Sequence, residues 1–111
     1  MGYDLHITRA DFWAINEGTW ITREEWLAAV RGDAELQLMD DVEPCPAEWL
    51  GDPSGHSFCF EWNEGNVVVK DPTDAAIRKM RDIASRLGGK VQGDDGELYE
   101  DAEGRSGIRS P

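Results

Sequence analysis

The 111-residue sequence predicts an α+β fold, with two helices packed on one face of a mainly antiparallel sheet of four to five strands. Three observations predict it. Two segments carry helix start and stop signals, several short segments alternate apolar and polar side chains with the period of a strand, and glycine turns join neighbouring strands. A chain of this length builds one core. We therefore expect a single domain over residues 1–104 and a flexible tail over residues 105–111.

The first strand is expected at residues 3–8, "YDLHIT", where apolar and polar side chains alternate. Because neighbouring side chains of a strand point to opposite faces, His6 should lie on the face opposite Leu5. The segment 9–20 that follows is aromatic and irregular, and it reaches a glycine turn before the next element. We interpret this segment as a loop.

The first helix begins within "ITREEWLAAVRGD". Thr22 as N-cap and Glu25 three residues later form a capping box. Ile21, just before the cap, is placed to contact Trp26 at the fourth helical position. Gly32 supplies the stop signal.

A short second strand, "ELQLM" at residues 35–39, precedes a long stretch rich in proline and glycine. This stretch, residues 40–56, is expected to be a surface connection. Within it, Trp49 and Leu50 should pack against the core.

A hairpin follows, with an alternating first arm, a turn that contains Gly65 and an apolar returning arm. The second helix comes next, in "DPTDAAIRKMRDIASRLGG". Asp71 is expected to cap it, Pro72 suits its first turn, and Gly88 ends it. The domain closes with "KVQGDDGELYE", a terminal hairpin whose tip is predicted at Asp95-Gly96.

Charge is the strongest overall signal: 23 Asp and Glu against 11 Lys and Arg give a formal net charge of -12. Binding to a phosphate backbone needs the opposite sign, so nucleic acid and anionic membranes are disfavoured as direct ligands. An acidic surface speeds the encounter with a basic protein instead. Acidity that serves only solubility is the competing interpretation. With no signal peptide or membrane span in the sequence, we expect a soluble, cytoplasmic protein.

No motif for nucleophilic or metal chemistry is present. Cys45 and Cys59 are isolated and expected to be reduced thiols, and His6 and His56 lack any accompanying catalytic signature. His56 and Cys59, three residues apart, would lie on opposite faces of a regular strand. We predict no catalytic residues, no metal site and no cofactor, and therefore a protein that is not an enzyme.

The candidate binding residues are acidic side chains of two segments and one aromatic residue that could anchor a partner. They are Asp94, Asp95, Glu97, Glu100, Asp40, Asp41 and Trp49. The terminal acidic run could also coordinate Ca²⁺ or Mg²⁺, but the spacing of a calcium-binding hand is absent. The preferred interpretation is an exposed turn that also serves as a docking surface.

Three segments together resemble a group of small, uncharacterised acidic bacterial proteins. They are "YDLHITRA", "ITREEWLAAV" and "VVVKDPTDAAIRKMRDIASRLGGKVQGDDGELYE". In size, charge and α+β layout, the chain is also similar to bacterial toxin-immunity proteins. The second resemblance implies a cytoplasmic inhibitor that binds a basic toxin, such as a nuclease, and blocks its active site. The alternatives are a phage-type nucleic-acid mimic that inhibits a DNA-binding complex such as a CRISPR effector, and a small metal-dependent enzyme using the C-terminal carboxylates.

Overall fold

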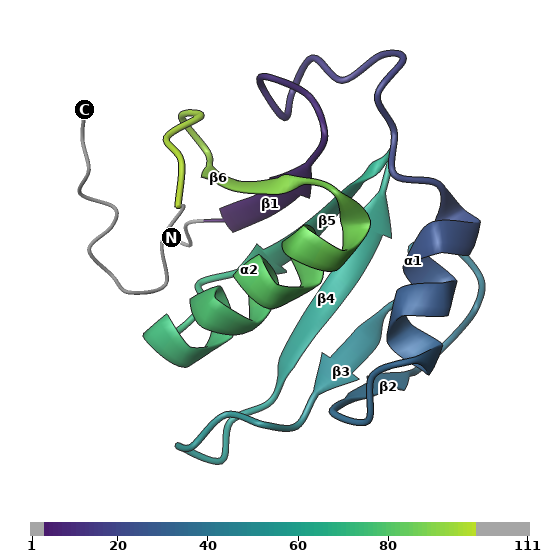
Figure 1. Cartoon of the computed structure of the whole chain (residues 1–111). Helices are drawn as coiled ribbons and strands as arrows, with labels where there is room; N and C mark the ends of the chain where they lie inside the picture. Colours follow the sequence, from purple (N-terminus) through teal and green to yellow (C-terminus); the bar gives the residue numbers. More distant parts are fainter. Residues whose placement is uncertain (1–3, 100–111) are drawn as a thin grey trace.

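The computed structural model describes residues 4–99, which form two helices and a six-stranded sheet (Figure 1). The elements are β1 (Asp4–Thr8), α1 (Arg23–Arg31), β2 (Leu36–Leu38), β3 (Ala47–Trp49), β4 (Phe58–Asn63), β5 (Asn66–Lys70), α2 (Asp74–Leu87) and β6 (Lys90–Gly93). The strand order is β2-β3-β4-β5-β1-β6, and every neighbouring pair is antiparallel. Neither helix is long and apolar enough to cross a membrane.

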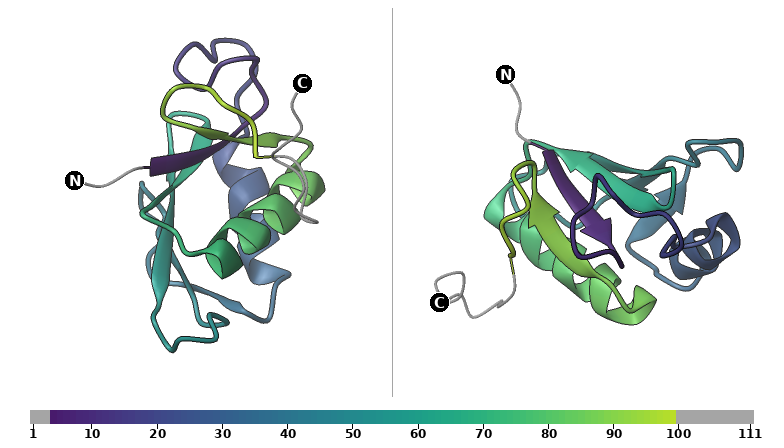
Figure 2. Two further views of the ribbon diagram at one scale, coloured as in Figure 1. Left: turned by 90° about the vertical axis from the view of Figure 1, so that its left-hand side faces the viewer. Right: turned by 90° about the horizontal axis from the view of Figure 1, so that it is seen from above.

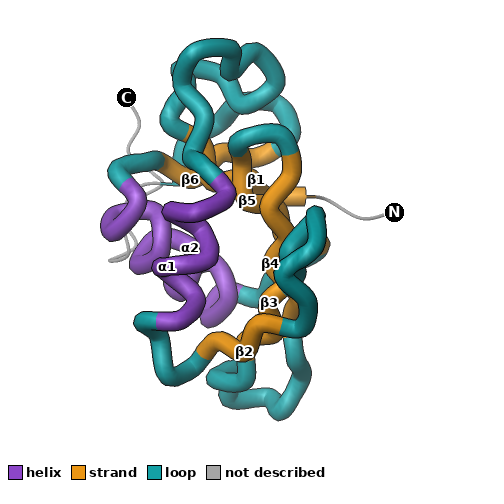
Figure 3. Tube along the Cα trace, turned by 90° about the vertical axis from the view of Figure 1, so that its right-hand side faces the viewer, coloured by secondary structure: helices purple, strands orange, loops and turns teal. Residues whose placement is uncertain are grey.

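Both helices lie on the same face of the sheet, as Figure 3 shows from the side. This confirms the predicted α+β class; the sheet has six strands where four to five were expected. The core fills the space between the two layers. Its largest fully buried side chains are Trp26, Phe60, Leu5, Ile7, Ile21, Met80, Ile83, Val30, Val67, Val69 and Val91. The other face of the sheet, called the open face below, carries no helix.

The extra strand is β3, which lies inside the stretch predicted as a surface connection. Ala47 pairs with Phe60 of β4 and with Leu38 of β2, so a three-residue strand joins β2 to the rest of the sheet. The prolines near β3 obscure the sequence pattern that would predict a strand there. The strand forms because it pairs on both sides and because Ala47 is buried.

The start of α1 follows the prediction closely. The Thr22 hydroxyl accepts a hydrogen bond from the Glu25 N–H at 3.1 Å, and the Glu25 carboxylate accepts one from the Thr22 N–H at 2.9 Å. Ile21 and Trp26 are both fully buried. The N–H of Gly32 donates to the carbonyl of Ala28 at the far end of the helix. The capping box and the glycine stop are therefore confirmed.

The cap of α2 differs from the prediction. Thr73, not Asp71, is the N-cap, and its hydroxyl accepts a hydrogen bond from the Ala76 N–H at 3.1 Å. An N-cap residue has extended dihedrals, which Thr73 adopts, whereas Asp71 has a positive φ of 45° and lies before the helix begins. The helix ends at Gly88, as expected, with a left-handed φ of 73°.

The β4–β5 hairpin is confirmed, with Glu64 and Gly65 at its two-residue turn. The terminal hairpin is also present, since the Tyr99 N–H donates to the Val91 carbonyl. Its tip differs by one residue from the prediction. The Gly96 N–H donates to the Gly93 carbonyl, so the two central residues of the turn are 94 and 95. Gly96 follows them with a φ of 87°, a conformation that favours glycine.

The loop at residues 9–20 folds over one end of the open face and lies beside the terminal turn (Figure 2). Gln92 of β6 fixes it there. Its side-chain oxygen accepts from the Trp13 N–H at 2.8 Å, and its side-chain nitrogen donates to the Asp11 carbonyl at 2.7 Å. Gln92 is thereby buried without an unsatisfied amide. The residues predicted as the tail, 105–111, lie outside the described residues.

Candidate functional site

The terminal turn presents only part of the predicted acidic group. Asp95 and Glu97 are exposed. Asp94 instead turns toward β1, where its carboxylate accepts hydrogen bonds from the His6 ring at 2.9 Å and from the Asp4 N–H at 3.2 Å. Glu100 lies outside the described residues. Asp94 therefore binds other residues of the fold, while Asp95 and Glu97 remain accessible to a partner.

The second acidic segment is distant from the first. Asp40 and Asp41 are exposed in the β2–β3 connection, where Asp40 accepts from the Val42 N–H and the Asp41 carbonyl accepts from Arg23. This connection leaves from β2, one edge strand of the sheet, whereas the terminal turn follows β6, the opposite edge strand. The fold therefore does not gather the predicted acidic residues into one patch.

Trp49 packs against the core, as expected from the sequence. It is 4% exposed, its ring stacks on Phe60 with an interplanar angle of 16°, and its indole N–H donates to Glu35 at 3.1 Å. Leu50 differs from the expectation, because it is 58% exposed. The buried Trp49 ring is therefore a poor anchor for a partner, although Trp49 also lines a neighbouring cavity.

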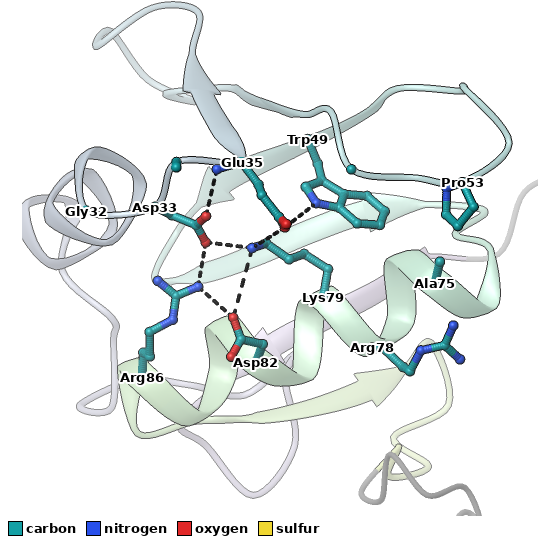
Figure 4. A pocket seen from close by; sticks show the side chains of 12 residues that line it. Gly32, Asp33, Glu35, Trp49, Pro53, Ala75, Arg78, Lys79, Asp82 and Arg86 are labelled. Atoms are coloured by element: carbon teal, nitrogen blue, oxygen red, sulfur yellow. Dashed lines mark hydrogen bonds and ion pairs between the residues drawn. The ribbon is translucent and has the colours of Figure 1, made fainter.

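That cavity, about 730 Å³ in volume, lies between α2 and the segment that follows α1 (Figure 4). An ion-pair network crosses it. The Lys79 ammonium lies 2.7 Å from Asp33 and 2.9 Å from Glu35, and the Arg86 guanidinium lies 2.6 Å from Asp33 and 2.9 Å from Asp82. The Lys79 and Asp33 side chains are only 9% and 8% exposed.

The pKa values of this network reflect its pairing. Burial alone would raise the pKa of the Asp33 carboxyl, but the hydrogen bond from Lys79 opposes it. Together with hydrogen bonds from a backbone N–H and from Arg86, it lowers that pKa from 3.8 to about 2. Burial would lower the pKa of Lys79, yet hydrogen bonds to Asp33 and Glu35 leave it raised. The network is thus a charged clamp that holds the segment after α1 onto α2.

Sequence reasoning missed this clamp because its partners lie far apart, with Asp33 and Lys79 separated by 46 residues. One local signal was present. Lys79, Asp82 and Arg86 fall at helical spacings of three and four, which places them on one face of α2.

A second cavity, about 400 Å³, lies on the open face beside the 9–20 loop and is called the His6 cavity here. Its lining is mostly polar or charged. It consists of Asp4, His6, Trp13, Ala14, Asn16, Glu61, Asn63, Glu64, Asn66, Val68, Lys70 and Asp94. His6 pairs with Val68 across the strands, so it lies on the face opposite Leu5, which confirms the predicted alternation.

His6 is the most buried charged or polar group of this cavity, at 4% exposed. Its ring stacks on Trp13 at a centroid distance of 3.7 Å and an interplanar angle of 5°. The hydrogen bond from His6 lowers the pKa of Asp94; burial opposes this effect, and the Asp4 N–H adds to it. The His6 Nδ1 atom is buried and has no hydrogen-bond partner in the described part of the chain.

The two cysteines are free thiols: Cys45 is buried, and Cys59 is exposed on β4. Burial, followed by the carboxylates of Glu61 and Glu48, raises the pKa of the Cys59 thiol. Two carboxylates therefore make this part of the open face negative. His56 is hydrogen-bonded to Ser54 at 2.9 Å.

Among residues 4–99, no group of three or more His, Cys, Asp or Glu side chains is arranged to hold a metal ion. Comparison with known proteins gives no match, whether to a family model, to a curated protein or to a solved structure.

Proposed function

We propose that the protein is a non-enzymatic binding protein of the immunity type, which neutralises a basic toxin by covering its active site. A nuclease toxin is the expected class, because the carboxylates would stand where nucleic-acid phosphates lie. The observation that supports the proposal is the net charge of -12 together with the carboxylates of the open face and the terminal turn that make no ion pair within residues 4–99.

The internal pairs involve Arg9, Lys79 and Arg86, each bound to at least one carboxylate at 2.9 Å or less. Several acidic residues on the strands and turns make no ion pair with any other residue in the described range, and six of them are candidates for contact with or attraction of a partner. They are Asp40, Asp41, Glu48, Glu61, Asp95 and Glu97. These carboxylates remain available to a partner, which favours steered encounter with a basic protein.

Within this surface, the open face and the terminal turn beside it are the proposed docking region. Glu48 and Glu61 lie on the open face, and Asp95 and Glu97 lie in the turn that follows its edge strand. Asp40 and Asp41, at the opposite edge, would contribute to long-range attraction rather than to the same contact.

A nucleic-acid mimic remains the alternative, and it needs carboxylates at regular intervals along a line. The cross-strand row through Glu61 continues through Val68, His6 and Gln92, which are not acidic. This interruption favours a compact basic protein surface as the partner over a channel shaped for duplex nucleic acid. A metal-dependent enzyme that uses the C-terminal carboxylates is the remaining alternative, and no arrangement described above favours it.

The test is affinity capture from the native host with the immobilised protein, followed by an assay of the captured protein's activity. We expect a basic protein whose activity is inhibited in the complex. The variant Asp95→Asn with Glu97→Gln should weaken the complex, because it removes two exposed carboxylates from the docking region and leaves Asp94 in place. Asp94 would be a poor choice, because it also holds His6.

A matched control removes the same charge elsewhere. Glu24→Gln with Asp74→Asn neutralises two exposed carboxylates at the starts of the two helices, on the helical layer. This control should bind nearly as the parent does. Equal weakening by both double variants, or an uninhibited partner, would refute the proposed docking region or the proposed inhibition, respectively.

A further inference from the structure

We propose that the His6 cavity is the pocket for an arginine side chain of the protein partner. This inference rests on the proposed function and names the part of the partner that the open face would bind. The cavity is formed where the 9–20 loop rises from the open face, so the loop supplies its walls and the strands supply its floor.

The charge of the cavity selects a cation. Its described lining contains four carboxylates, Asp4, Glu61, Glu64 and Asp94, and one lysine, Lys70. Asp94 is already bound to His6, but the other three carboxylates make no ion pair in the described part of the chain. An incoming positive charge would therefore meet carboxylates that the fold leaves unneutralised.

A second observation concerns His6 itself. Its Nε2 lies 2.9 Å from a carboxylate oxygen of Asp94 and so must carry the donated proton. In the neutral ring, Nδ1 is then an acceptor; it belongs to a residue that lines the cavity, and it is buried without a donor from residues 4–99. Buried acceptors without partners are uncommon in folded proteins. A guanidinium group carries several N–H donors, so it is a ligand suited to a cavity rich in acceptors.

Arginine fits these surroundings better than lysine does. A guanidinium group is planar and presents five N–H donors, so it can bind several carboxylates at once and stack on an aromatic ring. Trp13 supplies an indole in the wall, and Glu61 and Asp4 supply carboxylates. A lysine ammonium would also be attracted by the carboxylates, but it is not planar and cannot stack on the indole as a guanidinium group can.

The walls are held in place before any ligand arrives. Asn66 donates to the Trp13 carbonyl at 2.9 Å, Asn16 donates to the Glu64 carbonyl at 2.8 Å, and the Trp13 indole N–H donates to the Asp94 carbonyl at 3.1 Å. These bonds join the loop to β5, to the β4–β5 turn and to the terminal turn. A cavity fixed in this way loses little conformational entropy on binding, which favours the complex.

The experiment is an NMR titration of the full chain with the peptide acetyl-Gly-Arg-Gly-amide, read at the Trp13 indole N–H and the Asn66 side-chain amide. We expect saturable shifts at millimolar peptide. The same peptide with citrulline in place of arginine is neutral and nearly isosteric, and it should cause no saturable shift. Absence of shifts with the arginine peptide, or equal shifts with both, would overturn the proposal.

Three single variants sharpen the test. Glu61→Gln should weaken peptide binding at least about tenfold, as expected for loss of a hydrogen bond to a charged group. Lys70→Gln should strengthen binding, because it removes the competing cation. Glu48→Gln is the matched control: it changes the same residue type on the same face but lies outside the cavity lining, so binding should not change. Equal weakening by Glu48→Gln and Glu61→Gln would overturn the proposal, since attraction would then be non-specific.

The side chains of Glu48, Glu61 and Lys70 make no hydrogen bond or ion pair within residues 4–99, and a retained amide spectrum verifies that each variant is folded. Tighter binding of spermidine than of the arginine peptide would assign the cavity to free polyamines and overturn the inference. Failure here is distinct from failure of the proposed function. A captured basic partner that responds to the Asp95 and Glu97 variant but not to Glu61→Gln would retain the function and remove the pocket.

Discussion

The charged clamp between α2 and the segment after α1 gives the sharpest stability prediction. Lys79→Met removes an ammonium that lies 2.7 Å from Asp33, whose side chain is 8% exposed. Removing one partner of a buried ion pair costs about 3–5 kcal/mol. Arg86 remains 2.6 Å from the same carboxylate oxygen, so Asp33 keeps one cation and the cost should be smaller. The pair with Glu35 adds little, because Glu35 is 56% exposed.

We therefore expect Lys79→Met to lower the free energy of unfolding by about 2 kcal/mol, measured by urea denaturation. The midpoint of thermal unfolding should fall by about 8–15 °C. The double variant Asp33→Asn with Lys79→Met should be more stable than the sum of the single effects predicts, because no uncompensated charge is left buried.

Arg78→Met is the matched control, because Arg78 is an exposed cation of the same helix, and Figure 4 shows its guanidinium directed away from the network. It should change stability by less than about 0.5 kcal/mol. If Lys79→Met were as mild as this control, or if the two clamp variants were simply additive, the clamp would not stabilise the fold as argued.

Three further predictions concern a turn, a cap and pH. Gly65→Ala should lower the free energy of unfolding by about 2 kcal/mol, because the residue has a φ of 84° and an added Cβ would lie 2.3 Å from Trp20. Gly18→Ala is the control, with a φ of 82° and open space around the added Cβ. It should lower the free energy of unfolding by about half as much in the same urea assay. Thr73→Ala should cost about 1 kcal/mol through loss of the N-cap, and Thr73→Ser should restore most of it. Because the folded pKa of Asp33 is lowered from 3.8 to about 2, its contribution is fully present above about pH 4 and is lost as the pH falls toward 2. Asp33→Asn should flatten the stability profile in that window, and an unchanged profile would contradict the assignment.

Elements whose signals lie within a few residues could be predicted from the sequence. The capping box that starts at Thr22 and the turn at Gly65 each depend on neighbouring residues alone, and both are confirmed. The sequence does not predict β3, because its three residues form a strand only through pairing with β2 and β4. The cap of α2 was misassigned because Asp71 and Thr73 both suit an N-cap by residue type. The backbone dihedrals decide between them.

The candidate site follows the same division. Strand alternation correctly placed His6 on the open face, and composition correctly indicated an acidic surface. The contact between His6 and Asp94 joins residues 88 positions apart, and no local pattern announces it. For the same reason, the sequence could not separate carboxylates held in ion pairs from those left for a partner.

The proposed function requires the unpaired carboxylates of the open face and the terminal turn to bind a basic protein. The most direct measurement is the dissociation constant of the captured complex as a function of salt concentration, by calorimetry. We predict marked weakening as salt rises, mainly through slower association, and a smaller salt dependence for the Asp95→Asn, Glu97→Gln variant. A dissociation constant that does not change with salt, or an equal salt dependence in parent and variant, would contradict the claim.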